Sequence, residues 1–398
     1  MIVKRRSVFL IGGYDPKTPQ KFFERLTKEL ARADATWGMI STVSPVNLLS
    51  DGEVGTVDIE TAGDGWKVET HFGFLALDKA VLGYFLLPVH VRFFRYAAAF
   101  LDYMLSGTFF AMLCRSWRFA LYFLYPALML WLFAWLAERA GNWVSKLSFP
   151  SAGAYGIVAS LAVFWLLVRF GGMRGFILHL MDLWSFSLAF LRGRRPEAEA
   201  LFDRFAAAIV ARAKAEHVDE FILVGHSTGG GLVLDIAARC LAQDPDFTRR
   251  SGRTTLLTVG STAQKLGMHP AAVAFRKRVQ ALVDDPRLGW VDIQCHTDMV
   301  NFYKCNPVVD MGLQPRVKND PPGTPFPLTR TVRMKEMLQP EQYRRVRRNL
   351  FRLHYQYIFG NTRRYFYDFF LICCGPVPLA ERMLHSVVGV PSAKEPAT

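Results

Sequence analysis

The chain has 398 residues, of which 51% are hydrophobic, so it has core material for two or three domains or for one large domain with an insertion. Its 48 basic and 34 acidic residues leave a net charge of +14, which favours an anionic partner, and 14% aromatic residues with a positive mean hydropathy favour a lipid surface over nucleic acid. Six cysteines without C-x-x-C pairs exclude a disulfide-rich secreted scaffold and indicate a reducing compartment.

The first residues predict a buried strand rather than a signal peptide. The apolar run Val8 to Ile11 is too short for a signal-peptide core, and no small-residue cleavage site follows it. A turn at Gly12 to Asp15 leads into a helix with Thr18 as its N-cap and Pro19 in its first position. Strand-like runs then form a meander whose pairing is open: Thr36 to Val43, Thr56 to Thr61 and Trp66 to Phe72.

Two long uncharged runs, 119–137 and 147–168, predict a transmembrane helical hairpin with a polar loop at Glu138 to Lys146. The first run reaches about 28 Å as a helix, close to the hydrocarbon thickness of a bilayer. A pair of helices buried in a large soluble core is the alternative. The apolar segments 80–113 and 175–191 carry scattered charges, as interfacial helices do, and either could instead be a further span.

Arginines on both sides of the hairpin orient it. They precede and follow the two runs, whereas the loop between the runs holds only Arg139 and Lys146. The excess of positive charge marks the cytoplasmic side, so both ends of the hairpin should face the cytoplasm. The flanking arginines are Arg92, Arg95, Arg115, Arg118, Arg169, Arg174, Arg192, Arg194 and Arg195.

The remaining chain predicts an α/β fold with a mostly parallel sheet flanked by helices. Pro196 opens a helix, and strands alternate with helices after it: strand Phe221 to Val224, helix Gly230 to Ala242, strand Thr254 to Val259, helix Ala271 to Val283 and strand Trp290 to Cys295. The tail predicts a Pro-rich loop (315–327), an Arg-rich helix (341–352) and an aromatic helical segment (365–370). The predicted division is 1–78 and 196–398 for the α/β domain and 79–195 for the membrane insertion.

Gly225-His226-Ser227-Thr228-Gly229 fits the pattern G-x-S-x-G. Small residues on both sides of the serine permit a strained strand-to-helix turn that projects its hydroxyl oxygen. A hydrophobic strand precedes the motif and Gly230 and Gly231 open a helix after it, which is the context that this turn requires. A glycine-rich turn without chemistry is the alternative.

Through this motif the chain resembles the α/β-hydrolase superfamily, and its lipase and esterase members more loosely, over residues 1–75 and 196 to about 370. The resemblance implies a catalytic acid after a later strand and a histidine beyond it. Asp298, just past the strand Trp290 to Cys295, is preferred over Asp292 in the strand and Asp310 deep in a loop.

His354 and His385 are the histidines that follow Asp298 far enough along the chain to serve as its partner, and His354 lies in the better context, a histidine with aromatic neighbours after a helix. The backbone N–H of Thr228, next to the nucleophile, should bind the oxyanion together with that of Gly13 or Tyr14. A simple tight turn is the alternative for Gly13 and Tyr14, because no H-G-G-G pattern is present.

The chain departs from the superfamily pattern in two ways. It begins at what would be the third strand, and the membrane region interrupts the sheet before the nucleophile strand. Because residues 1–75 and 196 onward must meet in one sheet, they lie on one side of the bilayer and the number of spans must be even.

The predicted function is hydrolysis of a lipidic or long-chain acyl ester by Ser227, His354 and Asp298 at an anionic leaflet, with no cofactor, metal or nucleic acid. A thioesterase or acyltransferase would use the same residues, and a catalytically silent membrane scaffold would keep the same fold. A Walker A loop is absent, and Cys295, His296, Asp298 and Cys305 lack zinc-motif spacing. An arginine run at 344–352 could grip phosphate but is more simply a solvated or lipid-facing patch.

Overall fold

The computed structural model describes residues 2–314 and 326–390, which fall into two compact units. The sheet unit combines the described residues within Met1–Gly83 and Phe190–Thr398, and the helical unit covers Tyr84–Ala189. The chain therefore leaves the sheet unit, forms the helical unit and returns to the sheet unit.

One mixed sheet organises the sheet unit, in the order β2-β4-β5-β1-β6-β7-β8-β9, with β3 also paired to β4. Neighbours from β5 to β9 are parallel, whereas β2, β3 and β5 run antiparallel to β4. The prediction of an α/β fold with a largely parallel sheet is confirmed at this level. The strands are β1 Arg5–Ile11, β2 Ile40–Val43, β3 Asn47–Leu49, β4 Val54–Gly63, β5 Trp66–Leu75, β6 Glu220–His226, β7 Thr254–Val259, β8 Leu288–Cys295 and β9 Leu328–Val332.

Strand β1 lies between β5 and β6, which come from opposite sides of the helical unit in the sequence. Leu10 is in register with Phe74 of β5 and with Val224 of β6. The prediction that the two halves of the chain meet in one sheet is therefore confirmed. The meander of uncertain pairing is resolved as an antiparallel hairpin of β4 and β5, with β2 and β3 on its outer edge.

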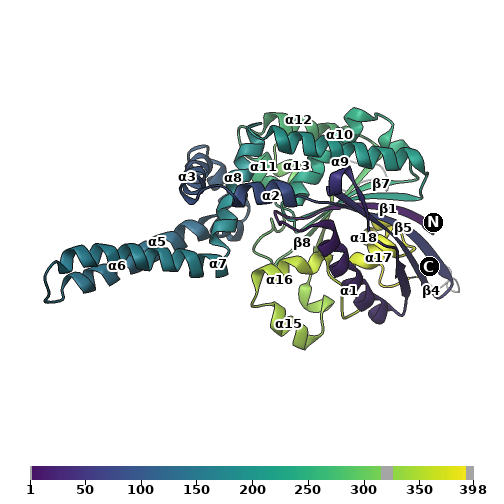
Figure 1. The fold of residues 1–398 in the computed structure, drawn as a ribbon. Coiled ribbons are helices and arrows are strands. Elements are labelled where there is room, and N and C mark those ends of the chain that lie inside the picture. Colours follow the sequence, from purple (N-terminus) through teal and green to yellow (C-terminus); the bar gives the residue numbers. More distant parts are fainter. Residues whose placement is uncertain (1, 315–325, 391–398) are drawn as a thin grey trace. The chain divides into compact units, whose positions relative to one another are not determined.

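Helices cover both faces of the sheet. Figure 1 shows α9, α10 and α12 on one face and α1, α17 and α18 on the other. The core on the α1 side includes Val8 and Leu10 of β1, Phe22 of α1 and Phe370 of α17. Helix bounds in this unit are α1 Pro19–Trp37, α9 Pro196–Ala215, α10 Gly229–Gln243, α11 Ala263–Gly267, α12 Val273–Asp284, α13 Pro307–Asp310, α14 Met334–Met337, α15 Pro340–Val346, α16 Leu350–Tyr355, α17 Phe369–Cys374 and α18 Leu379–His385.

Helix α1 begins as predicted and ends later than predicted. The Thr18 hydroxyl accepts a hydrogen bond from the Lys21 N–H, and Pro19 opens the first turn. The helix continues through Trp37 until Gly38 adopts the left-handed conformation. The predicted strand Thr36 to Val43 is therefore wrong in its first residues, and β2 begins at Ile40.

Three predictions in the tail need correction or lie outside the described residues. The Arg-rich helix 341–352 is two helices, α15 and α16, because Asn349 leaves the helical conformation and its side chain caps α16. The aromatic segment 365–370 is mostly non-helical, and α17 begins only at Phe369. Most of the predicted Pro-rich loop lies outside the described residues.

Two helical stretches in the helical unit, Trp117–Ser145 and Ala152–Arg174, are long and apolar enough to cross a membrane. The first contains the uncharged run 119–137. The second uncharged run, 147–168, was predicted to begin too early, because the helix opens at Ala152 and 147–151 lie in the connection. The predicted polar loop Glu138 to Lys146 is wrong in extent, because α5 continues to Ser145 and only 146–151 separate the helices. Helix α2 Asp78–Phe85 begins in the sheet unit and α8 Ile177–Leu191 ends there. The helices between them are α3 Val89–Leu105, α4 Thr108–Arg115, α5 Trp117–Ser145, α6 Ala152–Leu166, a π-helical turn Leu167–Gly171 and α7 Gly172–Arg174.

Helices α5 and α6 approach each other through small residues. A Cβ atom on Gly141 would lie 1.9 Å from the Ser160 hydroxyl oxygen, and one on Gly156 would lie 1.9 Å from that of Ser145. Each helix therefore contributes a Gly-x-x-x-Ser pair to the contact. Such small residues let two backbones approach closely, which is how helices pack inside a bilayer.

The segments predicted as interfacial form α2, α3, α4 and α8. Helices α3 and α4 are bent by 68° at the break between them. The Arg92 guanidinium on α3 forms two hydrogen bonds with the buried Asp182 carboxylate on α8, one of them from Nε at 3.0 Å. This pair joins the segments before and after the hairpin within the helical unit.

Candidate active site

Ser227 occupies the sharp turn between β6 and α10 with a φ of 60°, a conformation that costs a side-chain-bearing residue energy. The glycines on both sides of Ser227 are required because a side chain at either position would clash with neighbouring atoms. A Cβ on Gly225 would lie 2.5 Å from the Gly229 carbonyl oxygen, and one on Gly229 would lie 2.3 Å from that of Gly12. The G-x-S-x-G pattern is therefore explained by a turn that is crowded on both sides of the serine.

Neighbouring loops hold this turn in place. The Ser227 N–H donates to the Val259 carbonyl at the end of β7, and the Thr262 N–H donates to the Ser227 carbonyl, each at 3.1 Å. On the other side lies the turn after β1, where a Cβ on Gly13 would be 3.2 Å from Ser227 Cβ and 3.4 Å from its Oγ. The structure thus places Gly13 directly beside Ser227.

Asp298 and His354 form a buried pair although 56 positions separate them. His354 Nδ1 and Asp298 Oδ2 are 2.7 Å apart, and both side chains are almost fully buried. The other oxygen of Asp298 accepts a hydrogen bond from the Val300 N–H at 2.9 Å. His354 Nε2 is buried and has no hydrogen-bond partner in the described part of the chain. One nitrogen of the imidazole is therefore fixed by the carboxylate, and the other is available.

His354 packs against residues that flank Ser227. A Cβ on Gly260, the residue after Val259, would lie 3.0 Å from His354 Cε1. The rings of His226 and His354 are 4.7 Å apart, and His226 Nε2 is 3.0 Å from the His354 carbonyl oxygen. The structure thus brings His354 to the Ser227 turn. Within the described residues the serine and His354 Nε2 form no hydrogen bond.

The predicted oxyanion residues surround the same turn. Thr228 precedes α10, Gly13 adjoins Ser227, and the next residue, Tyr14, is buried. The backbone N–H groups of Thr228 and Gly13 donate no hydrogen bond to another described residue. These two groups are therefore available to a bound oxygen atom.

The alternative acids lie elsewhere. Asp292 is buried in β8, where it accepts hydrogen bonds from the Thr258 hydroxyl at 2.5 Å and from Gln294 at 2.7 Å. Burial raises the pKa of Asp292 to about 6. Asp310 ends the short helix α13 rather than lying in a loop, and the other candidate base, His385, ends α18.

Sequence reasoning missed two groups next to this site. Burial, and then the neighbouring His354, lowers the pKa of His226 well below its usual value, so His226 is neutral at pH 7. Lys265 on α11 is also buried and donates to the Thr228 hydroxyl at 3.2 Å, and burial lowers its pKa to about 7. His226 stood inside the motif, whereas nothing in the local sequence indicated Lys265.

A third missed feature connects the turn after β1 to α16. The Tyr355 hydroxyl donates to Asp15 at 2.5 Å and lies 3.2 Å from Lys17 Nζ. Tyr355 follows His354 directly, so this contact joins the segment of Gly13 to the segment of His354. A hollow of about 20 Å³ beside it is lined by Gly13, His226 and Tyr355, which is room for one water molecule.

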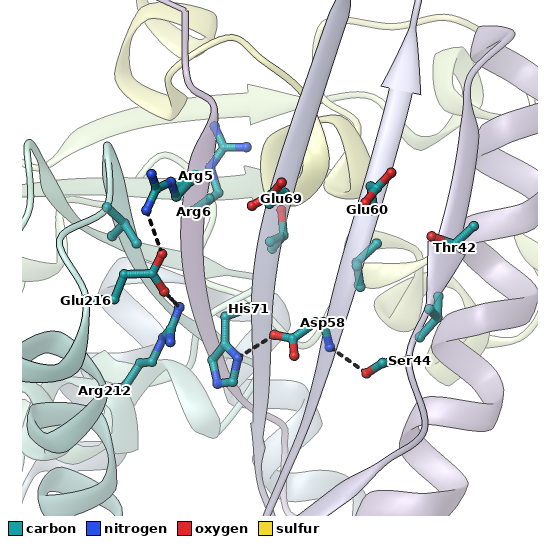
Figure 2. Close-up of a pocket in the computed structure, with 14 residues that line it drawn as sticks. Arg5, Arg6, Thr42, Ser44, Asp58, Glu60, Glu69, His71, Arg212 and Glu216 are labelled. Carbon is teal, nitrogen blue, oxygen red and sulfur yellow. Dashed lines mark hydrogen bonds and ion pairs between the residues drawn. The ribbon is translucent and has the colours of Figure 1, made fainter.

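A cleft of about 430 Å³ in the sheet unit is not lined by Ser227. It lies over the first residues of β1, whereas Gly13 follows the other end of that strand (Figure 2). Five of its charged or titratable side chains pair with one another: His71 with Asp58 at 2.7 Å, and Glu216 with Arg5 at 3.0 Å and with Arg212 at 2.5 Å. Across the described residues, no three His, Cys, Asp or Glu side chains form a metal-binding group.

Comparisons with known protein families, with curated proteins and with solved structures find no match to this chain.

Proposed function

We propose that the protein is a membrane-anchored serine hydrolase that cleaves the carboxylic ester of a lipid or of another long-chain acyl compound. The observation that carries the proposal is the convergence at one turn. Ser227 sits there in a strained conformation, Gly13 adjoins it, and the buried Asp298–His354 pair packs against its neighbours. Three segments far apart in the sequence bring together the groups that acyl transfer requires.

Each group has a role in the proposed reaction. His354 Nε2 takes the proton of the Ser227 hydroxyl as Oγ attacks the ester carbonyl carbon, and Asp298 stabilises the imidazolium through Nδ1. Backbone N–H groups of Thr228 and Gly13 bind the oxyanion. The imidazolium then protonates the departing alcohol. The acyl group stays bound to Ser227 as an ester. Water, deprotonated by His354, attacks this ester and releases the carboxylic acid and the free serine.

The order of the strands agrees with this proposal. The candidate nucleophile follows β6, the candidate acid follows β8 and the candidate base follows β9, which is the chain order Ser, Asp, His of the α/β-hydrolase superfamily. Strand order likens this chain to the superfamily by analogy only, because one fold can host many functions. The proposed roles of Ser227, Asp298 and His354 therefore rest on the chemistry of these side chains.

Membrane anchoring comes from the helical unit. Because both halves of the chain join in one sheet, an even number of crossings is required, and the two long apolar helices satisfy this. The bent pair α3–α4 could cross only if α8 also crossed. The arginines on both flanks of the hairpin favour a cytoplasmic position for the sheet unit, next to the lipids of that leaflet.

Labelling with a fluorophosphonate probe in membranes tests the proposal, since the probe reacts with an activated serine. The parent protein should label, and Ser227→Ala and His354→Ala should not. Ser261→Ala, a buried serine in the next loop, and His385→Ala are the matched controls and should label like the parent. Failure of the parent to label beside an active control hydrolase would favour a catalytically silent scaffold.

A further inference from the structure

Helix α15, the first turn of α16 and the short connection between them display five arginines on the surface of the sheet unit. We call Arg344, Arg345, Arg347, Arg348 and Arg352 the arginine ridge, and all five are exposed. Figure 1 shows α15 and α16 next to each other in this unit. Among the described residues, only Arg344 of the ridge has a carboxylate within ion-pair distance, that of Glu341 at 4.0 Å, which is the limit of an ion pair. The ridge is therefore almost uncompensated positive charge.

The ridge is held by structure rather than being a loose basic tail. Tyr343 and Val346 of α15 pack against the hydrophobic core, so the arginines between and after them face outward. The Asn349 side chain accepts a hydrogen bond from the Arg352 N–H at 2.9 Å and starts α16. Two residues later on the same helix, His354 points inward and is buried. The ridge and the candidate base are thus parts of one short segment.

The arginine ridge also contains an exposed apolar side chain. Leu350 lies between Arg348 and Arg352, and 43% of its surface is exposed. Basic residues around an exposed apolar residue are typical of segments that lie at a lipid interface, where head groups bind the charges and the apolar group enters the acyl boundary.

We infer that the arginine ridge is a docking surface for anionic lipid head groups, which brings the segment of His354 to the leaflet. The inference rests on the membrane anchoring in the proposed function. A lipid partner is favoured over nucleic acid because two helices of the same chain suit a membrane span and tether the sheet unit at both of its connections.

The test uses the full chain in vesicles of phosphatidylcholine, with or without 30% phosphatidylserine. A Leu350→Cys variant in a Cys114→Ser background carries an environment-sensitive dye, and spin-labelled lipid quenches the dye if Leu350 meets the bilayer. We expect at least about tenfold stronger quenching with phosphatidylserine, and most of this gain should disappear in high salt.

Replacing Arg344, Arg345, Arg347 and Arg348 with Gln should abolish the phosphatidylserine effect. The matched control replaces four exposed basic residues elsewhere in the sheet unit, Arg249, Arg253, Lys277 and Arg287, and should keep it. Both quadruple variants should label with the fluorophosphonate at the parent rate in detergent, which shows that they are folded.

Equal quenching in both vesicle types, equal loss in the control variant, or saturable RNA binding that prevents docking would overturn the inference. The outcome is separable from that of the proposed function, because Ser227→Ala should dock like the parent. If Ser227→Ala docks while the parent fails to label, the docking surface is supported and the hydrolase proposal is contradicted.

Discussion

The two units of this protein direct their large apolar side chains in opposite ways. In the sheet unit every residue of β6 and β7 is buried between the flanking helices. In the helical unit, large apolar side chains on the two long helices face outward, among them Trp131 with 68% and Leu161 with 66% of its surface exposed. The exposed apolar surface of α5 and α6 is compatible with the membrane anchoring proposed above, in which hydrocarbon surrounds these two helices.

The same difference governs what holds each unit together. Water drives the apolar side chains of the sheet unit into a core, but lipid gives no such drive between helices. Helices α5 and α6 are instead joined where Gly141 and Gly156 let their backbones meet. The sheet unit also contains buried polar pairs, such as Arg6 with Glu220 at 2.7 Å and His354 with Asp298. Four predictions test these contrasts, from the largest expected effect to the smallest.

The largest effect should come from breaking the Asp298–His354 pair. Asp298→Asn should slow labelling by the fluorophosphonate about a thousandfold or more, because the amide no longer stabilises the imidazolium. Asp292→Asn removes a different buried acid, in β8, and should leave the labelling rate within about threefold of the parent. A comparable loss in both variants would mean that the fold, and not the pair, was damaged.

A charge on an outward-facing leucine should distinguish the two solvents. Leu161→Arg should cost about 3 kcal/mol of membrane insertion, whereas Leu48→Arg, at an exposed site of the sheet unit, should change stability by only about 0.5 kcal/mol or less. Alkaline extraction of membranes and thermal unfolding in detergent measure the two effects. If both variants insert and melt like the parent, α6 does not lie in lipid.

The next largest effect should come from placing a large side chain at the close contact between α5 and α6. Gly141→Leu should destabilise the hairpin by about 1–3 kcal/mol, because its side chain would overlap Ser160 and the Gly156 carbonyl. Gly153→Leu on α6 is the control, since a Cβ there would have no atom within 4 Å. Monodispersity after mild detergent extraction reports the outcome, and equal behaviour of the two variants would contradict the close contact.

The smallest effect, a shift of a few degrees, concerns Asp292. Its pKa is about 6 in the folded protein and about 3.9 in an unfolded chain, so between these values the folded state binds more protons. The stability that Asp292 confers therefore falls as pH rises from about 4 to 6. The melting temperature of Asp292→Asn minus that of the parent should rise over this range and stay constant above it. Parallel curves for the two proteins would contradict this assignment.

Local chemistry in the sequence predicted local structure well. Thr18 with Pro19 marked the start of α1, Pro196 marked that of α9, and the small residues around Ser227 marked its turn. The first error, a strand beginning at Thr36, arose from distant contacts. Trp37 Nε1 donates to Asp368 at 2.9 Å and the Thr36 hydroxyl donates to the Asn361 carbonyl at 2.8 Å, which hold the last turn of α1.

The polar loop was mispredicted for a similar reason. Glu138 accepts a hydrogen bond from Asn142 along the helix at 2.9 Å, and Gly141 lies in the contact with α6, so polar residues continue α5. In the candidate site, the G-x-S-x-G motif predicted Ser227, and the chain order implied by the resemblance predicted Asp298 and His354. The contacts of His354 with His226 and of Tyr355 with Asp15 join residues more than 100 positions apart, and no local pattern records such pairs.

The central position of β1 has a consequence for the order of synthesis. β1 and its first partner, β5, leave the ribosome early, but its second partner, β6, follows about 150 residues later. At about 5–20 residues per second, the nascent chain waits roughly 10–30 s, while the two apolar helices are made, with one edge of β1 unpaired. The first half of the sheet must therefore persist as an incomplete template until the segment that carries Ser227 emerges and completes it.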